Sequence, residues 1–221
     1  MDFNFGLIWK FAVPLAQGLG TSILLSLICM ALGSLLGLAL ALARSSPSRL
    51  LRLPAVAFVE LFRGTPVLIQ LFWVFFCLPL VLGFEPASFT SGVVALSLFT
   101  GAVTSETFRA ALRSIGSEQR DASVALGLSR WTRMRYVILP QMALRATPVL
   151  LSNSITLFKE TALVAAVGIS DLMSVGENIS NSIGRPVEIL TTVAVVYFVI
   201  AFPFTRIVTL LEKRLLRKLA L

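Results

Sequence analysis

Residues 11–43 read FAVPLAQGLGTSILLSLICMALGSLLGLALALA and contain no charged side chain. A helix that crosses a bilayer needs about 20 consecutive, mostly apolar residues, so this run is long enough to span a membrane. It is too long for a cleaved signal peptide and lacks a basic region in front of it, because only Lys10 precedes it. The stretch therefore predicts an integral membrane protein.

The composition of the whole chain points the same way. Of its 221 residues, 57% are hydrophobic and 14% are charged, whereas a soluble domain carries about 25% charged residues. The chain contains no histidine, which excludes His-dependent catalysis and His-ligated metal sites. Cys29 and Cys77 both lie in apolar runs, so we interpret them as packing residues rather than as a disulfide or metal ligands.

Charge-free runs mark the other membrane spans, and flanking apolar residues extend the shorter ones. We predict one all-α transmembrane domain over residues 1–221, with an interfacial segment at 1–13. The five predicted spans lie near residues 17–43, 54–82, 89–112, 146–168 and 188–211.

The loops between these spans alternate in charge. Loops 44–53 and 113–145 and the C-terminal tail are rich in arginine and lysine, whereas loops 83–88 and 169–187 are not. Because basic loops face the cytoplasm, we predict that the N-terminus lies outside and the C-terminus inside. The net charge of +8 is then mostly a matter of topology, and no nucleic-acid partner is expected.

The long cytoplasmic loop is expected to contain two short helices, over residues 118–126 and 130–138. Gly127 would end the first helix in a left-handed cap, Ser129 would cap the start of the second, and Pro140 would stop it. Such a pair could protrude as a compact element. The alternative, which the residues alone leave open, is an amphipathic hairpin lying on the membrane.

This loop carries a resemblance to a known family. Asp121-Ala122-Ser123, Gly127 and then Val137-Ile138-Leu139-Pro140 have the spacing of the EAA loop of ABC importer permeases. That pattern is Glu-Ala-Ala, three residues, Gly, nine residues, Ile, one residue and Leu-Pro. The chain departs from it with Asp for Glu, Ser for the second Ala and Val for Ile. The resemblance implies an ATPase-coupling loop over 116–140, with its contact residues at Asp121, Ala122, Ser123, Gly127, Leu139 and Pro140.

Three further segments, in the same order, resemble the polar-amino-acid branch of that family. Residues 62–66 (FRGTP) with Gln70 are similar to its RGTP segment, and residues 105–109 (SETFR) to its "aEifR" segment. Residues 140–141 (PQ) and 159–163 (KETAL) are similar to its "LPQ…KdTSL" run, with Glu for Asp and Ala for Ser. The resemblance as a whole covers about residues 18–175.

The resemblance implies a type I ABC importer permease, in which two five-span subunits, identical or related, work as a pair. Its partners would be two cytoplasmic ATPase subunits, which carry the ATP and Mg²⁺, and a periplasmic or lipid-anchored solute-binding protein. The location would be the bacterial cytoplasmic membrane. No cofactor is expected on this chain, which has no GxxxxGK[ST] phosphate loop.

Charged side chains inside membrane spans carry a free-energy cost, so their presence indicates a structural or functional role. Glu60 and Arg63 are three residues apart, as are Glu106 and Arg109, so each pair shares a helix face. One interpretation is that the pairs neutralise themselves and tie helices together. The other is that Arg63, Glu106 and Arg109 line a path for a zwitterionic substrate.

The fourth span carries a polar stripe. Asn153, Thr156 and Glu160 share a face, and the adjacent Lys159 cannot neutralise Glu160 in the way an i,i+3 partner would. We interpret Asn153, Thr156 and Glu160 as pathway residues whose carboxylate suits a substrate ammonium or guanidinium. The alternative is a polar seam buried between paired subunits.

The predicted function is that of a permease subunit of an ABC importer for a polar amino acid or a close relative such as an opine. The chain is not expected to be an enzyme, because ATP hydrolysis would take place on the partner. An intramembrane enzyme is disfavoured, because no HExxH motif and no convincing Ser/Lys or paired-Asp site occurs in mid-span. A structural membrane protein without a substrate path is the remaining alternative.

Overall fold

The computed structural model describes residues 5–83 and 86–219, and the elements found in them are all helical. In chain order they are η1 (Phe5–Phe11), α1 (Ala12–Arg44), α2 (Arg49–Gly64), α3 (Val67–Phe72), η2 (Trp73–Cys77), α4 (Leu78–Leu82), α5 (Ser88–Ser114), α6 (Ser117–Ala125), α7 (Arg130–Arg133), η3 (Met134–Ile138), α8 (Leu139–Glu160), η4 (Thr161–Val167), α9 (Leu172–Ile183) and α10 (Pro186–Leu219).

Among the described residues, four helices are long and apolar enough to cross a membrane, and a fifth crossing is made if one bent pair counts as a span. The all-helical membrane fold predicted from the sequence is therefore confirmed. The first predicted segment, 1–13, corresponds in part to the 3-10 helix η1, while residues 1–4 lie outside the described part of the chain.

The region of the second predicted span, 54–82, is sharply bent. The chain bends by 109° between residues 49–64 and 67–82. Pro66 forces the residue before it out of the helical region, and Thr65 accordingly has φ −114° and ψ 145°. The side chain of Gln70 then donates from Nε2 to the carbonyl oxygens of Phe62 (2.7 Å) and Thr65 (3.0 Å). Gln70 thus satisfies carbonyl groups that the end of α2 leaves without a helical partner.

The predicted stop at Pro140 is wrong, because the helix that begins at Arg130 continues through this residue to Glu160. A π-helical turn, η3, precedes the proline, and the N–H of Leu139 donates to the carbonyl of Met134 five residues earlier. Pro140 falls in the first turn of α8, where its missing N–H is tolerated. The fourth span is therefore continuous with the second half of the long loop that precedes it.

Small residues allow α1 and α5 to pack closely. Gly33 and Gly37 of α1 face α5, where a β-carbon at Gly33 would lie 2.6 Å from the side chain of Thr100. Thr104 donates from Oγ1 to the carbonyl of Gly33 (3.0 Å) and to that of Thr100 in its own helix (2.8 Å). Such small-residue contacts are typical of helix packing in membranes.

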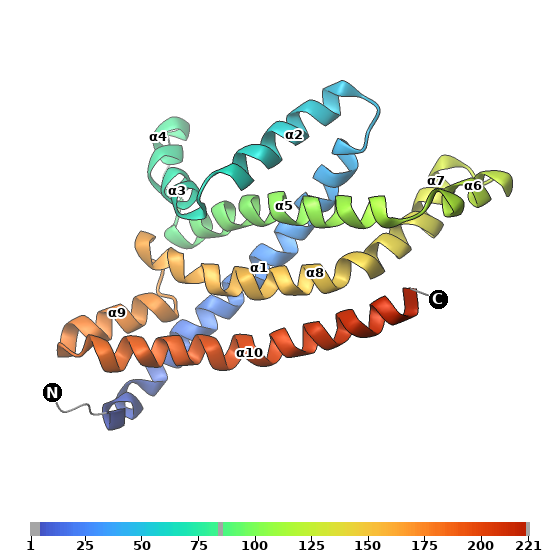
Figure 1. The fold of residues 1–221 in the computed structure, drawn as a ribbon. Helices are drawn as coiled ribbons and strands as arrows, with labels where there is room; N and C mark the ends of the chain where they lie inside the picture. Colours follow the sequence, from blue (N-terminus) through green and yellow to red (C-terminus); the bar gives the residue numbers. More distant parts are fainter. Residues whose placement is uncertain (1–4, 84–85, 220–221) are drawn as a thin grey trace.

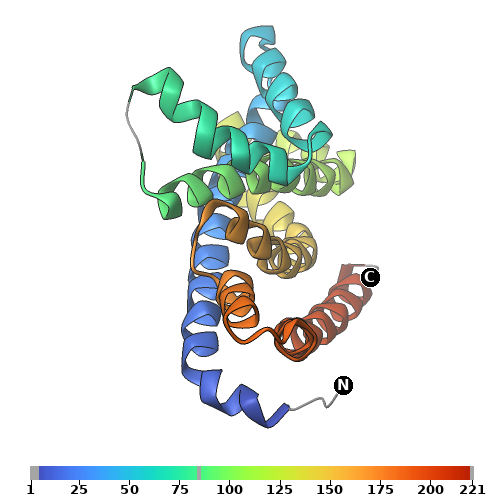
Figure 2. The same cartoon turned by 90° about the vertical axis from the view of Figure 1, so that its left-hand side faces the viewer.

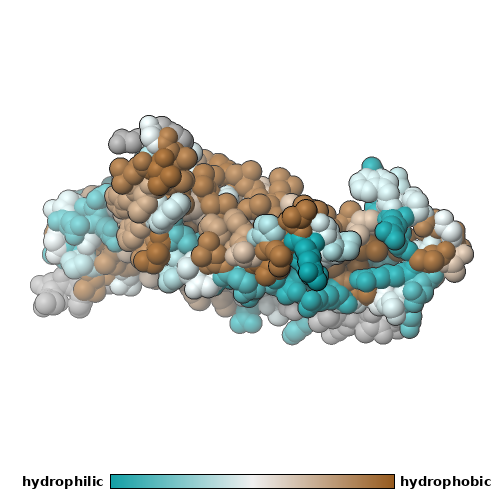
Figure 3. All heavy atoms as spheres, turned by 90° about the horizontal axis from the view of Figure 1, so that it is seen from above, coloured by the Kyte–Doolittle hydropathy of each residue, from teal (hydrophilic) through white to brown (hydrophobic). Residues whose placement is uncertain are grey.

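The long helices form a layer that is backed by α1. Helices α2, α5, α8 and α10 lie on one side, and α1 crosses behind them (Figures 1 and 2). The α6–α7 region and the end of α10 lie at one end of the molecule, and η1 lies at the other (Figure 1). Hydrophobic side chains cover much of the middle of the face seen in Figure 3, and hydrophilic ones are more frequent toward its ends.

Candidate functional site

The long loop between α5 and α8 forms a protruding element, residues 117–138, which we call the coupling element after its predicted role. Its first helix, α6, ends in a Schellman motif: the N–H of Gly127 donates to the carbonyl of Val124 (2.9 Å), and that of Leu128 donates to the carbonyl of Ser123 (3.1 Å). Gly127 has φ 69°, as the predicted left-handed cap requires. Ser129 caps the next helix, its hydroxyl accepting from the N–H of Thr132 at 3.1 Å, also as predicted.

The coupling element presents large apolar side chains outward. Val124, Leu126, Trp131 and Tyr136 are all more than half exposed. Several exposed large apolar side chains on one protruding element are typical of an interaction surface.

The predicted coupling residues fall into two groups. Asp121, Ala122, Gly127 and Pro140 are exposed, whereas Ser123 is buried and Leu139 is half-buried. The hydroxyl of Ser123 donates to the carbonyl of Arg120 at 2.6 Å. Ser123 and Leu139 therefore support the element from inside, and the exposed residues are the ones that a partner could touch.

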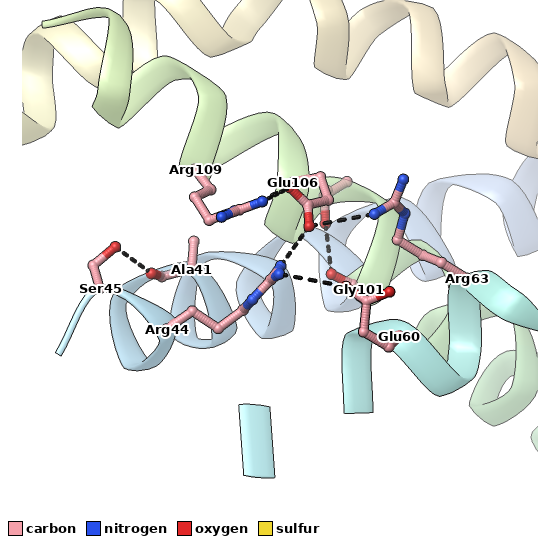
Figure 4. Close-up of polar contacts among 9 residues, drawn as sticks. Ala41, Arg44, Ser45, Glu60, Arg63, Gly101, Glu106 and Arg109 are labelled. Atoms are coloured by element: carbon pink, nitrogen blue, oxygen red, sulfur yellow. Dashed lines mark hydrogen bonds and ion pairs between the residues drawn. The ribbon is translucent and has the colours of Figure 1, made fainter. Parts of the chain in front are cut away.

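A second site is an ion cluster centred on Glu106 (Figure 4). Arg44 at the end of α1 approaches its Oε1 to 2.6 Å, and Arg63 at the end of α2 approaches the same atom to 3.3 Å. Arg109 donates to Oε2 from Nε at 3.0 Å and from Nη2 at 2.8 Å. Glu60 lies 3.8 Å from Arg44. The cluster joins three helices and sets three guanidinium groups against two carboxylates.

This geometry corrects one pairing that the sequence suggested. Glu106 and Arg109 do form an i,i+3 ion pair. Glu60 and Arg63, in contrast, reach in different directions: Glu60 faces Arg44, and Arg63 faces Glu106. The sequence analysis missed Arg44, which is the most enclosed guanidinium of the cluster, with a side chain 5% exposed. Its position as the residue that ends the first charge-free run was the only signal.

The side chains of the polar stripe on α8 have different neighbours. Asn153 donates from Nδ2 to the hydroxyl of Thr107 on α5, at 3.1 Å. Thr156 instead lines a groove of about 270 Å³ between α8 and α10. This groove is lined by Pro148, Val149, Ser152, Ile155, Thr156, Lys159, Thr205, Val208 and Thr209.

Asn153 is therefore engaged by α5, and the path along Asn153, Thr156 and Glu160 stays a prediction. Glu160 is half-buried and does not line the groove. Lys159, which the sequence analysis weighed only as the neighbour of Glu160, is the charged residue that does.

Outside the spans, Asp171 is a buried carboxylate that the sequence analysis counted only as a loop charge. It caps α9, its oxygens accepting from the N–H groups of Ser174 (2.9 Å) and Met173 (3.2 Å). The hydroxyl of Tyr197 donates to it at 3.3 Å. Burial raises the pKa of Asp171, and these hydrogen bonds oppose the shift. An aspartate directly before a helical segment was the available signal.

The remaining candidates for chemistry are the two cysteines. Cys29 and Cys77 are both free thiols, the first buried and the second exposed. Within residues 5–83 and 86–219, no group of three or more acidic, cysteine or histidine side chains is arranged to hold a metal ion.

The sequence of residues 32–217 matches the family described as binding-protein-dependent transport system inner membrane component. The chain is 34% identical to the glutamine transport system permease protein GlnP of Escherichia coli (strain K12) over 218 residues, which cover 97% of this chain and 99% of GlnP. It is 33% identical to the arginine transport system permease protein ArtQ of Bacillus subtilis (strain 168), with 90% of this chain and 91% of ArtQ covered.

Solved structures resemble the fold over nearly its whole length. The crystal structure of an amino acid ABC transporter with histidines matches with a TM-score of 0.90 and 31% sequence identity, covering 97% of this chain and 100% of that chain. An inward-facing structure of the MetNI methionine ABC transporter matches with a TM-score of 0.73 at 21% identity, covering 95% of this chain and 99% of that chain. The second likeness concerns the fold alone.

Proposed function

The chain belongs to the family of binding-protein-dependent transport system inner membrane components, and from this premise we propose that it is the permease subunit of an ATP-driven importer of polar amino acids. Similar chains are named for the transport of glutamine and arginine, and a solved structure with 31% sequence identity is of an amino acid ABC transporter with histidines. These substrates share an α-ammonium and an α-carboxylate group and carry a polar side chain.

The observation that carries this proposal is the coupling element. Val124, Leu126, Trp131 and Tyr136 expose apolar surface that a bound protein partner would bury. We propose that this surface, with Asp121, Ala122 and Gly127, docks on an ATPase subunit. ATP and Mg²⁺ would be bound by that partner, whose closure would push the permease between inward-facing and outward-facing states.

The polar groove between α8 and α10 supports a substrate path. Ser152, Thr156 and Lys159 lie within the fourth span, and a charged side chain facing lipid there costs about 2.5–3.5 kcal/mol. The groove is therefore expected to face water or another protein chain. We propose that a second permease subunit, identical or related, closes it into a path, and that Glu160 at the end of α8 contributes negative charge nearby.

The full complex would then hold two permease subunits, two ATPase subunits and a solute-binding protein at the outer face of the bacterial cytoplasmic membrane. The N-terminus of this chain would lie outside and its C-terminus in the cytoplasm. In this arrangement the permease catalyses no reaction and carries no cofactor of its own.

The deciding experiment is reconstitution of the chain with its ATPase and binding protein in liposomes. ATP-dependent uptake of radiolabelled glutamine, arginine or glutamate, with ATP hydrolysis stimulated by the loaded binding protein, is expected. If a complex assembles but moves none of these amino acids and its ATP hydrolysis ignores the binding protein, the chain is a structural membrane protein instead.

A further inference from the structure

The cytoplasmic end of α5 is held by two arginines from other elements. Arg145 of α8 donates from Nη1 to the carbonyl of Ser114 (2.5 Å) and to its hydroxyl (3.1 Å). Arg120 of α6 donates from Nη2 to the carbonyl of Leu112 (3.2 Å). The last carbonyls of a helix have no partner within it, and the negative end of the helix dipole attracts cations. The guanidinium groups of Arg120 and Arg145 supply both the missing donors for these carbonyls and the positive charge that the helix end attracts.

Arg120 lies in the coupling element itself. The backbone link between α5 and α6 is only residues 115–116, and a second side-chain contact ties α6 to α8, where Gln141 donates to Gln119 at 3.3 Å. Arg120 is an exposed residue of α6, and its guanidinium group reaches back to the carbonyl of Leu112 in α5. Helix α6 is therefore attached to α5 and α8 by side chains as well as by the chain connection.

Helix α5 continues from this attachment to the ion cluster. Leu112 lies six residues beyond Glu106 in the same unbroken helix, which corresponds to about 9 Å along its axis. At Glu106 the helix is tied to α1 through Arg44 and to the bend of the second span through Arg63. A push on α6 thus has a continuous hydrogen-bonded route to the bend.

We propose that Arg120 is a positioning residue that transmits the movement of the coupling element to α5, with Arg145 holding the same helix end from α8. The α5 helix would carry the movement to Glu106 and, through Arg63, to the bent span. This inference rests on the proposed function, since it assumes that α6 contacts the ATPase. It adds a role for side chains behind that contact, which do not touch the partner.

The test uses the complete complex of permease, ATPase and binding protein. The variant Arg120→Gln is expected to keep the ATPase subunit during purification in detergent. Its ATP hydrolysis should lose stimulation by the loaded binding protein, on the order of tenfold, and uptake per ATP should fall with it. Arg120→Lys keeps a charged donor and is expected to recover part of the stimulation. Arg113→Gln is the matched control, since Arg113 is exposed in the same last turn of α5.

Two outcomes would overturn the proposal. Normal stimulation of ATP hydrolysis in Arg120→Gln would show that the contact between Arg120 and the end of α5 transmits no movement. Loss of the ATPase subunit would place Arg120 in the docking surface instead. If Arg120→Gln fails to insert, Arg145→Gln is measured in the same way, and unchanged stimulation in it overturns the proposal. Failure of the proposed function itself is distinguishable, because the unmodified complex would then show no stimulation to lose.

Discussion

The guanidinium group of Arg63 lies 3.3 Å from the carboxylate of Glu106, although Arg63 ends the first half of the bent span and Glu106 lies in α5. Arg63 is the most exposed arginine of the cluster. Its side chain is 45% exposed, compared with 5% for Arg44 and 27% for Arg109. Arg44 and Arg109 therefore contact Glu106 at shorter distances than Arg63 does, and Arg63 is the residue at the bend.

Glu106→Gln is expected to destabilise the permease. The variant leaves the cluster with three guanidinium groups and one carboxylate, that of Glu60, which lies near Arg44. Breaking a buried ion pair costs about 3–5 kcal/mol, and the partial exposure of Glu106 lowers our expectation to about 2–3 kcal/mol. Thermal unfolding of the purified permease in detergent measures the loss.

The control for this variant is Glu60→Gln, whose carboxylate is 65% exposed and should cost less than about 1 kcal/mol. Adding Arg63→Gln to Glu106→Gln should recover part of the loss, because it removes one unpaired cation. Equal effects of Glu60→Gln and Glu106→Gln would contradict the view that Glu106 is the centre of the cluster.

The sequence predicted the pairing of Glu106 with Arg109 because both lie on one helix, where residues three apart are neighbours. It could not predict Arg44 and Arg63 as partners, since these contacts depend on how α1 and α2 pack against α5. The same limit applies to Asn153. The sequence predicted which helix face Asn153 lies on. It could not predict that Thr107 of α5 contacts Asn153.

The helix bounds show a similar division. Helix α5 begins and ends within two residues of the predicted third span, because charged residues flank its apolar run. The bend at Thr65 had a local signal, the Gly64–Pro66 pair, which the length of the apolar stretch outweighed. The continuation through Pro140 had no such signal, because it depends on a π turn whose widened hydrogen bonding only the three-dimensional structure shows.

Gly37→Ala is expected to separate α1 from α5. A β-carbon at Gly37 would lie 2.9 Å from the carbonyl oxygen of Gly101 and from the backbone nitrogen of Ser105, and neither backbone atom can rotate away. Overpacking of this kind costs about 1–3 kcal/mol. Gly20→Ala, in the same helix but with nothing within 4 Å of its added carbon, should be neutral. Equal unfolding temperatures for the two variants would contradict this packing.

The topology of the chain can be read with a reporter that is active only in the cytoplasm. Fused after Leu221, the reporter should be active, because the basic tail is expected to stay inside. Fused after Gly83, beyond the bent span, it should be silent. Activity at both positions would mean that the bent helix pair re-enters the cytoplasmic side and does not cross the membrane.

Glu160→Gln keeps the size of the side chain and removes its charge. If Glu160 meets the ammonium or guanidinium group of a substrate, uptake should fall by roughly tenfold, the value of a hydrogen bond to a charged group. The complex should still assemble. Asn153→Ala is the informative companion, because Asn153 contacts Thr107 and should affect stability more than uptake. Normal uptake by Glu160→Gln over a wide range of substrate concentrations would remove it from the path.

Gly127 offers the sharpest test of the coupling element, because its backbone conformation disfavours a side chain whereas its surroundings leave space for one. Its φ of 69° penalises a β-carbon by roughly 1–2 kcal/mol, yet an added carbon there would meet no atom of this chain within 4 Å. Gly127→Asn should be tolerated best, since asparagine visits this region more readily. Gly127→Ala should be intermediate, and Gly127→Arg adds bulk on an exposed surface.

All three Gly127 variants should insert and fold in the membrane. We expect only Gly127→Arg to lose the ATPase subunit during purification in detergent, because the arginine would stand in the docking surface. Gly127→Ala should keep the subunit with reduced stimulation of ATP hydrolysis, since strain at the end of α6 tilts the following helix. If Gly127→Arg retains the ATPase and transports normally, this surface is not the contact. The exposed apolar side chains of the loop would then be better explained by an element that lies on the membrane.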